Sequence, residues 1–222
     1  MPGCFFRLWV ELMRKTVVVA ILVFAVFVLA FSDKLKNKEK IMEARKYAAA
    51  PAAGGMMRIS VNGHTFDMDV YEYPDKAGEI PAGGMKYPEA EAACKSVGKR
   101  LCTAGEWMEA CRGKEMYLYS FAKEKKGFDD NKKACNNIHS SRSAAPSGSF
   151  RKCVSQDGLY DMSGNLWEWV EKSGTGAWPA KGGSYRDGEL SHRCEFTFKL
   201  FESQAEKLSF DNFGVRCCRD AR

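Results

Sequence analysis

The stretch GLYDMSGNLWEWV, residues 158–170, contains two tryptophans that flank a glutamate and follow a Ser-Gly-Asn turn. In a β-strand successive side chains point to opposite faces, so Trp167 and Trp169 would share one face and Glu168 would lie on the other. Two indoles on one face, with Trp107 available to pack on them, are more typical of a buried core than of a carbohydrate-stacking platform. The stretch therefore predicts a turn that leads into a core strand.

The same stretch contains two carboxylates, Asp161 and Glu168, on either side of a turn whose backbone carbonyls could also act as ligands. Hard oxygen ligands of this kind suit Ca²⁺. The alternative is that Glu168 is a buried acid paired with an arginine such as Arg216, while Asp161 caps a turn. The residues alone leave both interpretations open.

Length and composition indicate one globular domain with short appendages. The chain has 222 residues, of which 45% are hydrophobic and 28% are charged, as in ordinary globular domains. Its 34 basic and 28 acidic residues give a net charge of +6. Lys/Arg clusters do not alternate with aromatic residues as they do in a nucleic-acid-binding face, so nucleic acid is not expected as a partner.

An uncharged apolar segment lies near the start of the chain. Residues 16–32 read TVVVAILVFAVFVLAFS, close to the lower limit of about 17 to 25 residues for a membrane-spanning helix. The alternative is a cleavable signal peptide, although a clean small-x-small cleavage site is missing. We therefore expect a cytoplasmic segment at 1–15, a transmembrane helix at 16–32, a stalk at 33–55 and a folded domain at 56–222.

The cysteines indicate on which side of the membrane the domain lies. Eight of the nine follow residue 90, and only Cys4 precedes the apolar segment. Basic residues flank that segment on both sides, so the positive-inside rule does not decide the orientation. An even set of cysteines beyond the segment fits an oxidising exterior. We expect a single-pass protein of the cytoplasmic membrane, with its N-terminus inside and its C-terminal domain periplasmic or extracellular.

The pattern after residue 55 predicts an α+β domain. An Asn-Gly turn between two alternating runs predicts a β-hairpin from Met56 onward. Two helices follow, one with Pro88 in its first turn and one with Thr103 and Glu106 as a capping box. Residues 113–157 are rich in Lys, Ser, Asn and Gly, which predicts a long irregular region. Short strands are then expected at NLWEWV, KGGSY, CEFTF and GVRCC.

Four motifs carry a family resemblance. They are GKRLCTAGEWMEACRG (98–113), GLYDMSGNLWEWV (158–170), KGGSYRD (181–187) and FGVRCCRD (213–220). In this order and rough spacing they resemble the formylglycine-generating enzyme, or sulfatase-modifying factor, family, and in particular a cysteine-rich bacterial branch of it. The resemblance covers residues 56–222. It implies a modified, loop-rich C-type lectin-like fold that is held together by disulfides.

The resemblance also implies a calcium site in the first quoted stretch. The family binds calcium at the matching positions through the side chains of Asp161 and Glu168 and the main-chain oxygens of Gly164 and Leu166. We therefore expect one structural Ca²⁺ as the cofactor of this domain.

The enzyme of this family converts a cysteine or serine of sulfatases to formylglycine and uses a copper-binding pair of cysteines just after the Gly-Gly-Ser motif. Here that region reads GGSYRDGELSHRCEF, in which Cys194 is the single cysteine. Cu(I) prefers soft thiolate ligands, for which Asp187 or Glu189 would be hard substitutes. Copper is therefore not expected, and the oxidase activity is not carried over to this chain.

Another branch of the family binds iron through three histidines. This chain has only His64, His139 and His192, and nothing in their spacing places them together. All three are expected to be solvated surface residues.

The resemblance implies two of the expected disulfides, Cys94–Cys217 and Cys111–Cys194. The remaining four cysteines are paired by a guess as Cys135–Cys153, which would close the irregular region, and Cys102–Cys218. Adjacent strand residues point to opposite faces, so residues 217 and 218 can each bond to a different partner. The alternative of a zinc or redox cluster would require C-x-x-C spacing, which does not occur. A vicinal disulfide between residues 217 and 218 is a further alternative.

These features predict a membrane-anchored, exported, non-catalytic binding or scaffold module. Its expected partners are the membrane and other protein subunits, since a stapled fold on an anchor suits an accessory subunit of a larger membrane or envelope complex. One alternative is a copper oxidase of the formylglycine-generating type that acts on a sulfatase cysteine. A second alternative is a lectin-like ligand-binding module. Fold alone does not distinguish among them.

Overall fold

The computed structural model describes residues 55–61, 63–174, 176–201 and 210–221, together with Ser32 and Ser203. The chain divides into two compact units, Met1–Tyr47 and Ala48–Arg222, and almost all described residues belong to the second. The expected segments at 1–15, 16–32 and 33–55 lie outside the described residues, except for Ser32 and Gly55. None of the helices in the described part is long and apolar enough to cross a membrane.

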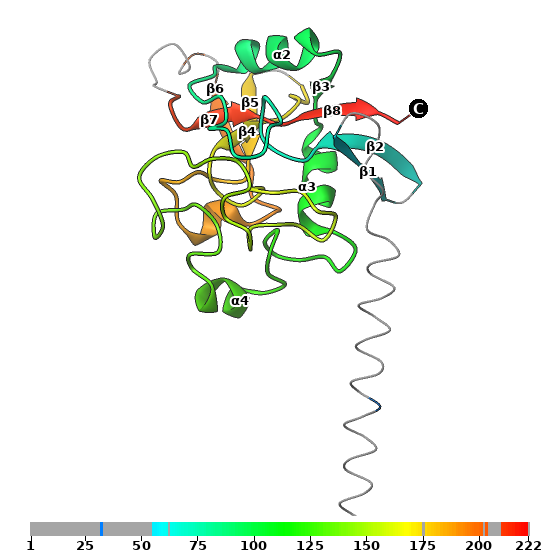
Figure 1. Cartoon of the computed structure of the whole chain (residues 1–222). Helices are drawn as coiled ribbons and strands as arrows, with labels where there is room; N and C mark the ends of the chain where they lie inside the picture. The colour runs from blue at the N-terminus through cyan, green and yellow to red at the C-terminus, as the bar shows by residue number, and fades with distance from the viewer. Residues whose placement is uncertain are drawn as a thin grey trace, which may run out of the picture. The chain divides into compact units, whose positions relative to one another are not determined.

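The described residues of the second unit form two small sheets and a few short α-helices (Figure 1). The first sheet has the order β1-β2-β8-β3, and its strands are Met56–Val61, His64–Asp69, Cys217–Asp220 and Arg100–Leu101. The second sheet has the order β6-β5-β4-β7, and its strands are Phe198–Phe201, Ala177–Lys181, Trp167–Trp169 and Phe213–Val215. The helices are α2 (Tyr87–Ser96), α3 (Ala104–Arg112) and α4 (Lys125–Asp130), and a 3-10 turn, η1, spans Glu189–His192.

Local sequence signals explain where several of these elements begin. Strands β1 and β2 form the expected antiparallel hairpin, with Val61 opposite His64. Thr103 caps α3 as expected, because its hydroxyl accepts from Glu106 N at 3.1 Å while the Glu106 carboxylate accepts from Thr103 N at 2.8 Å. The long region after α3 contains one short helix, α4, and is otherwise irregular.

Two strands lie earlier or later than expected. The strand expected at KGGSY is β5, which ends at Lys181 because Gly182 and Gly183 both have positive φ and turn the chain out of the sheet. The strand expected at CEFTF begins only at Phe198, because residues before it form a turn at Cys194.

Strand β4 separates two apolar cores. Trp167 and Trp169 lie in one of them with Trp178 and Phe213, and the Trp169 and Phe213 rings stack at 4.7 Å. The expectation of a core pair is therefore confirmed, and these two buried indoles offer no carbohydrate platform. Trp107 was expected to pack on this pair but lies in the other core, on the Glu168 side of the strand.

Four disulfides connect these elements, and their pairing is the one expected from the sequence. The bonds are Cys94–Cys217, Cys102–Cys218, Cys111–Cys194 and Cys135–Cys153. Cys217 and Cys218 are adjacent in β8, yet one belongs to the first core and the other to the second. One face of strand β8 is thereby bonded to Cys94 of α2, and the other face is bonded to Cys102, which lies two residues before α3 begins.

Candidate functional site

The centre of the domain is a fully buried ion pair between Glu168 of β4 and Arg216, which lies between β7 and β8. Arg216 Nη2 lies 2.8 Å from Glu168 Oε1, and both side chains are at most 1% exposed. The rest of the guanidinium donates to main-chain oxygens of Asp69 at 3.0 Å, Val70 at 2.7 Å and Tyr160 at 2.6 Å. Arg216 therefore ties the β1–β2 hairpin, the 158–166 turn and β4 to one another.

Glu168 has a second donor on its other oxygen. Trp107 Nε1 of α3 donates to Glu168 Oε2 at 2.5 Å, while Arg216 Nε lies 3.1 Å from each carboxylate oxygen. These contacts are those of the alternative interpretation, in which Glu168 is a buried acid paired with Arg216.

Asp161 and Glu72 are two further buried acids beside this pair. Asp161 has positive φ and accepts from Gly148 N at 2.7 Å, which is the turn-capping role of the same alternative. Glu72 accepts from Leu166 N at 3.0 Å and from Asn165 Nδ2 at 2.5 Å. Burial raises the pKa of Asp161 to about 6 and that of Glu72 well above its usual value, and neighbouring carboxylates add to both shifts.

Charge and contacts give different indications about calcium at this position. Three buried carboxyl groups face one guanidinium, an imbalance that either protons or a divalent cation would offset. The oxygens of Glu168 already accept from Arg216 and Trp107. Among the described residues, no three His, Cys, Asp or Glu side chains are arranged to hold a metal ion. The calcium site expected from the sequence has only two carboxylates, and Gly164 and Leu166 supply main-chain oxygens. The excess of buried carboxyl groups over guanidinium groups is the observation that favours this site.

The turn between the two carboxylates packs against the Gly-Gly-Ser loop. Gly164 N donates to Gly182 O at 2.8 Å, and Tyr185 N donates to Asn165 O at 3.0 Å. A Cβ on Gly164 would lie 2.2 Å from Asn136 O, so only glycine fits this close approach. The 161–166 turn therefore supports the loop in which this family has its copper-binding cysteines.

In that loop, Asp187 serves to shape the backbone. Its Oδ2 accepts from Ser184 N at 2.9 Å and from the Ser184 hydroxyl, and Ser184 Oγ in turn accepts from Asn212 Nδ2 at 2.9 Å. Cys194 follows at the end of the loop and is bonded to Cys111 of α3. Every cysteine of the described residues is in a disulfide, so none of them offers a thiolate in this state.

His192 was expected on the surface and is instead fully buried. The 3-10 turn η1 directs it inward, where Nδ1 lies 2.6 Å from Gly188 O and the ring packs near Phe128. Burial lowers its pKa, so the imidazole is neutral and Nδ1 carries the proton that is donated to Gly188. His64 lies elsewhere, on β2, beside Glu106 at 3.0 Å. The described residues hold no three-histidine metal cluster.

A surface hollow of 380 Å³ adjoins the Gly-Gly-Ser loop. Its lining residues are Ile138, Ser141, Arg142, Tyr185 and Arg186. Ile138 is 58% exposed, and its N–H donates to Asp187 O at 3.2 Å. The hollow therefore combines an exposed apolar side chain with guanidinium groups, as binding surfaces often do.

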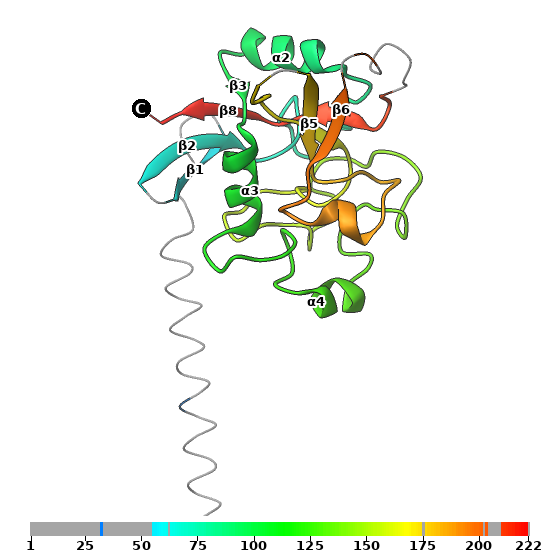
Figure 2. The same cartoon turned by 180° about the vertical axis from the view of Figure 1, so that it is seen from behind.

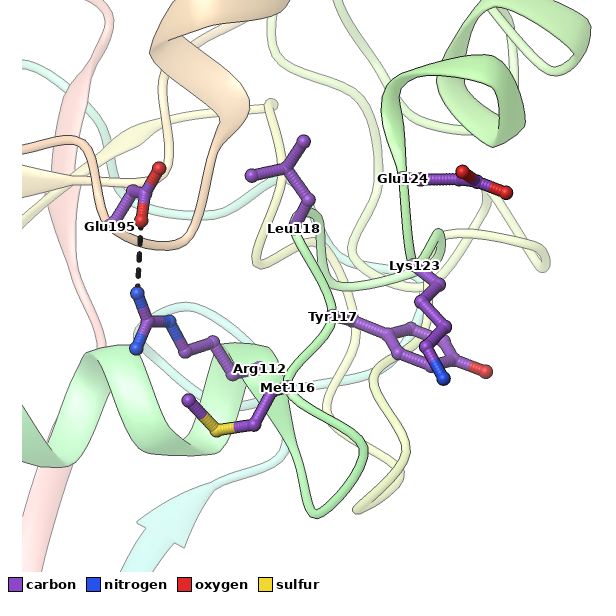
Figure 3. A pocket seen from close by; sticks show the side chains of 7 residues that line it. All are labelled: Arg112, Met116, Tyr117, Leu118, Lys123, Glu124 and Glu195. Carbon is purple, nitrogen blue, oxygen red and sulfur yellow. Dashed lines mark hydrogen bonds and ion pairs between the residues drawn. The ribbon is translucent and has the colours of Figure 1, made fainter.

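A second hollow, of 270 Å³, lies where α3 ends (Figure 3). Arg112 and Glu195 both line this hollow and point toward each other, and Arg112 Nη2 donates to Glu195 Oε2 at 3.0 Å. Each directly follows one cysteine of the Cys111–Cys194 disulfide, so that bond sets their separation. Met116 beside them is 57% exposed.

The sequence profile of the family described as "Sulfatase-modifying factor enzyme 1-like domain" matches residues 36–221. The chain belongs to this family. Among curated proteins it is similar to the inactive C-alpha-formylglycine-generating enzyme 2 of Mus musculus, with 28% identity over 160 residues that cover 64% of this chain and 50% of that protein. The Bos taurus protein of the same name is 29% identical and is covered to 51%. The chain thus spans about half the length of these relatives.

Solved structures show the same fold at low sequence identity. Treponema denticola variable protein 1 has a TM-score of 0.54 and 12% identity, and the match covers 75% of this chain and 99% of that one. PvdO from Pseudomonas aeruginosa has a TM-score of 0.57 and 16% identity, with coverage of 79% and 87%. The expected α+β, C-type lectin-like family fold is confirmed for the domain.

Proposed function

We propose that this protein is a non-catalytic binding module of the sulfatase-modifying factor family. The observation that carries the proposal is the disulfide between Cys111 and Cys194, which is the single cysteine in residues 182–196, the Gly-Gly-Ser motif and the loop after it. A copper dithiolate needs two free thiolates, and this loop has none. The relatives named as inactive formylglycine-generating enzymes support the same proposal.

The module is proposed to dock on other protein subunits as a membrane-anchored, exported accessory subunit. Residues 16–32 would supply the anchor, and the surface loops would supply the contact. Support for such contacts comes from exposed apolar side chains outside the sheets and α-helices, notably Ile138 in the irregular region and Leu190 in η1, at 58% and 59% exposure. Scattered exposed apolar residues are common, but these two belong to segments that adjoin the Gly-Gly-Ser loop.

Size analysis of the full-length protein, extracted from its native membrane in mild detergent, tests the docking role. We expect wild type to migrate as part of a larger assembly, and Ile138→Asp to shift toward the monomer because a charge enters an apolar contact. Val97→Asp is the matched control, since Val97 is 49% exposed but lies at the end of α2. A wild-type chain that migrates alone at monomer size would refute the docking role.

Structural calcium is proposed at the expected position, with Asp161 and Glu168 as side-chain ligands and Gly164 and Leu166 as main-chain ligands. If it binds, a chelator should lower the melting temperature by about 5–10 °C, the shift expected when calcium is at about 100 times its Kd. Asp161→Asn should abolish this dependence, whereas Asp157→Asn, in the same segment, should retain it. An unchanged melting temperature of wild type on addition and removal of calcium would contradict the site.

A further inference from the structure

A disulfide gathers four basic side chains at one place on the domain surface. Lys132 and Lys133 precede Cys135, and Arg151 and Lys152 precede Cys153. The Cys135–Cys153 bond holds the two Cα atoms 4.8 Å apart. Two basic dipeptides from distant parts of an irregular region are therefore fixed next to each other.

Three of these side chains line a common hollow. It has a volume of 490 Å³ and is lined by Asp129, Asp130, Asn131, Lys132, Lys133, Ala134 and Lys152. It lies where α4 ends, and α4 stands at the opposite end of the domain from α2 (Figures 1 and 2). We call the hollow together with Arg151 the basic hollow. All four of its basic residues are exposed.

The positive charge of the basic hollow is not neutralised within the described part of the chain. Asp129 and Asp130 lie at its edge, but they pair with Lys125 at 2.8 Å and Lys126 at 2.9 Å along α4. No acidic side chain of the described residues forms an ion pair with the four basic residues. The four basic residues outnumber the two aspartates of the lining, so the basic hollow keeps an excess of positive charge, which attracts an anionic partner.

The lining restricts the kind of anion that would fit. No aromatic side chain lines the hollow, so it offers no platform for stacking nucleobases or sugar rings. Its cations are mainly lysine ammonium groups, which act as point charges and do not require the planar bidentate geometry of arginine sites. Ala134 is the one apolar residue of the lining, so little is available to insert into a lipid bilayer. A recess of this size admits carboxylate side chains of an extended polypeptide.

We propose that the basic hollow docks an acidic segment, rich in Asp and Glu, of a partner protein. The inference rests on the proposed docking function and names the surface and the chemistry of the partner. Attraction of this kind acts at long range, raises the rate of encounter and weakens as salt increases.

Fluorescence anisotropy with a labelled oligo-glutamate peptide tests this assignment on the full-length protein in neutral detergent. Replacing the four basic residues with glutamine should weaken peptide binding at least about tenfold at low salt, since each lost charge removes part of the attraction. Lys125→Gln with Lys126→Gln is the matched control, because these lysines lie in the same region but are already paired. The control should change affinity by less than about threefold.

A second variant separates geometry from charge. Cys135→Ser with Cys153→Ser keeps all four cations but releases the two dipeptides, so we expect the affinity for the peptide to fall. Three results would overturn the proposal: an equal loss in the Lys125/Lys126 control, tighter binding of inorganic polyphosphate than of the peptide, or preference for mixed micelles containing phosphatidylglycerol.

Failure of this inference is distinguishable from failure of the proposed function. If the native assembly survives replacement of all four basic residues, the basic hollow is not its docking surface, although the docking role stands. If the wild-type chain has no assembly, the docking role itself fails, whatever the peptide affinity.

Discussion

Replacing Arg216 with glutamine is expected to lower the free energy of unfolding by about 3–5 kcal/mol, the usual cost of breaking a buried ion pair from one side. The substitution leaves the Glu168 carboxylate in the core without its cation. It also removes donors from the main-chain oxygens of Asp69 and Val70, at the end of β2, and of Tyr160, so two segments lose their connection through this side chain. Denaturant titration of the full-length protein, with disulfides intact, measures the loss.

Arg186→Gln provides the matched control for this prediction. Arg186 pairs with Asp211, but both side chains are about half exposed, so the loss is expected to stay within about 1 kcal/mol. If the two variants lose similar amounts of stability, the Arg216–Glu168 pair is not the central connection of the domain.

The second large effect is expected from removing the disulfide between α2 and β8. Cys94 and Cys217 are 123 residues apart, but the neighbouring Cys102–Cys218 bond stays intact, so Cys94→Ser with Cys217→Ser opens only the short loop between these two bonds and should cost about 3 kcal/mol in the chain-entropy model. Its reference is the pair Cys135→Ser with Cys153→Ser, which opens a separation of 18 residues and should also cost about 3 kcal/mol.

The comparison of these two double variants is informative because both remove one buried disulfide. If one of the two double variants loses much more stability than the other, local packing, not loop length, determines the contribution of each bond. Denaturant midpoints measured under identical non-reducing conditions decide between these outcomes.

Much of the fold follows from local signals in the sequence. The Asn-Gly turn, the Thr103 capping box and the alternation around Glu168 act over a few residues, and each produced the expected element. The pairing of cysteines is a long-range property, and eight cysteines allow 105 connectivities. The family resemblance implied two of the pairs, Cys94–Cys217 and Cys111–Cys194, and the other two were a guess among the four cysteines that remained. The four bonds in the structure are the ones expected.

The details of the site were harder to predict from the sequence, because they depend on tertiary packing. Trp107 was assigned to the wrong side of β4, since a helix pattern does not tell which core the helix faces. His192 was taken as a surface residue, because a polar loop gives no sign of the inward η1 turn. Glu72 was not recognised as part of the acid network, as its partners Asn165 and Leu166 lie more than 90 residues away.

The eight cysteines of the described residues are all in disulfides, so none of them is a free thiolate that could bind copper. Cys111 and Cys194 are the decisive pair, because Cys194 is the single cysteine in the loop that directly follows the Gly-Gly-Ser motif, residues 182–196. The same bond places Arg112 against Glu195, so it also shapes a surface hollow (Figure 3).

The most direct test is a thiol map of the full-length protein. The protein is unfolded in denaturant without reductant, alkylated, digested and examined by mass spectrometry. We expect no label on any cysteine from Cys94 to Cys218, and recovery of Cys111 and Cys194 as one linked peptide pair. Alkylated Cys194 in protein purified from its native source would contradict this expectation, since a free thiol would then follow the Gly-Gly-Ser motif.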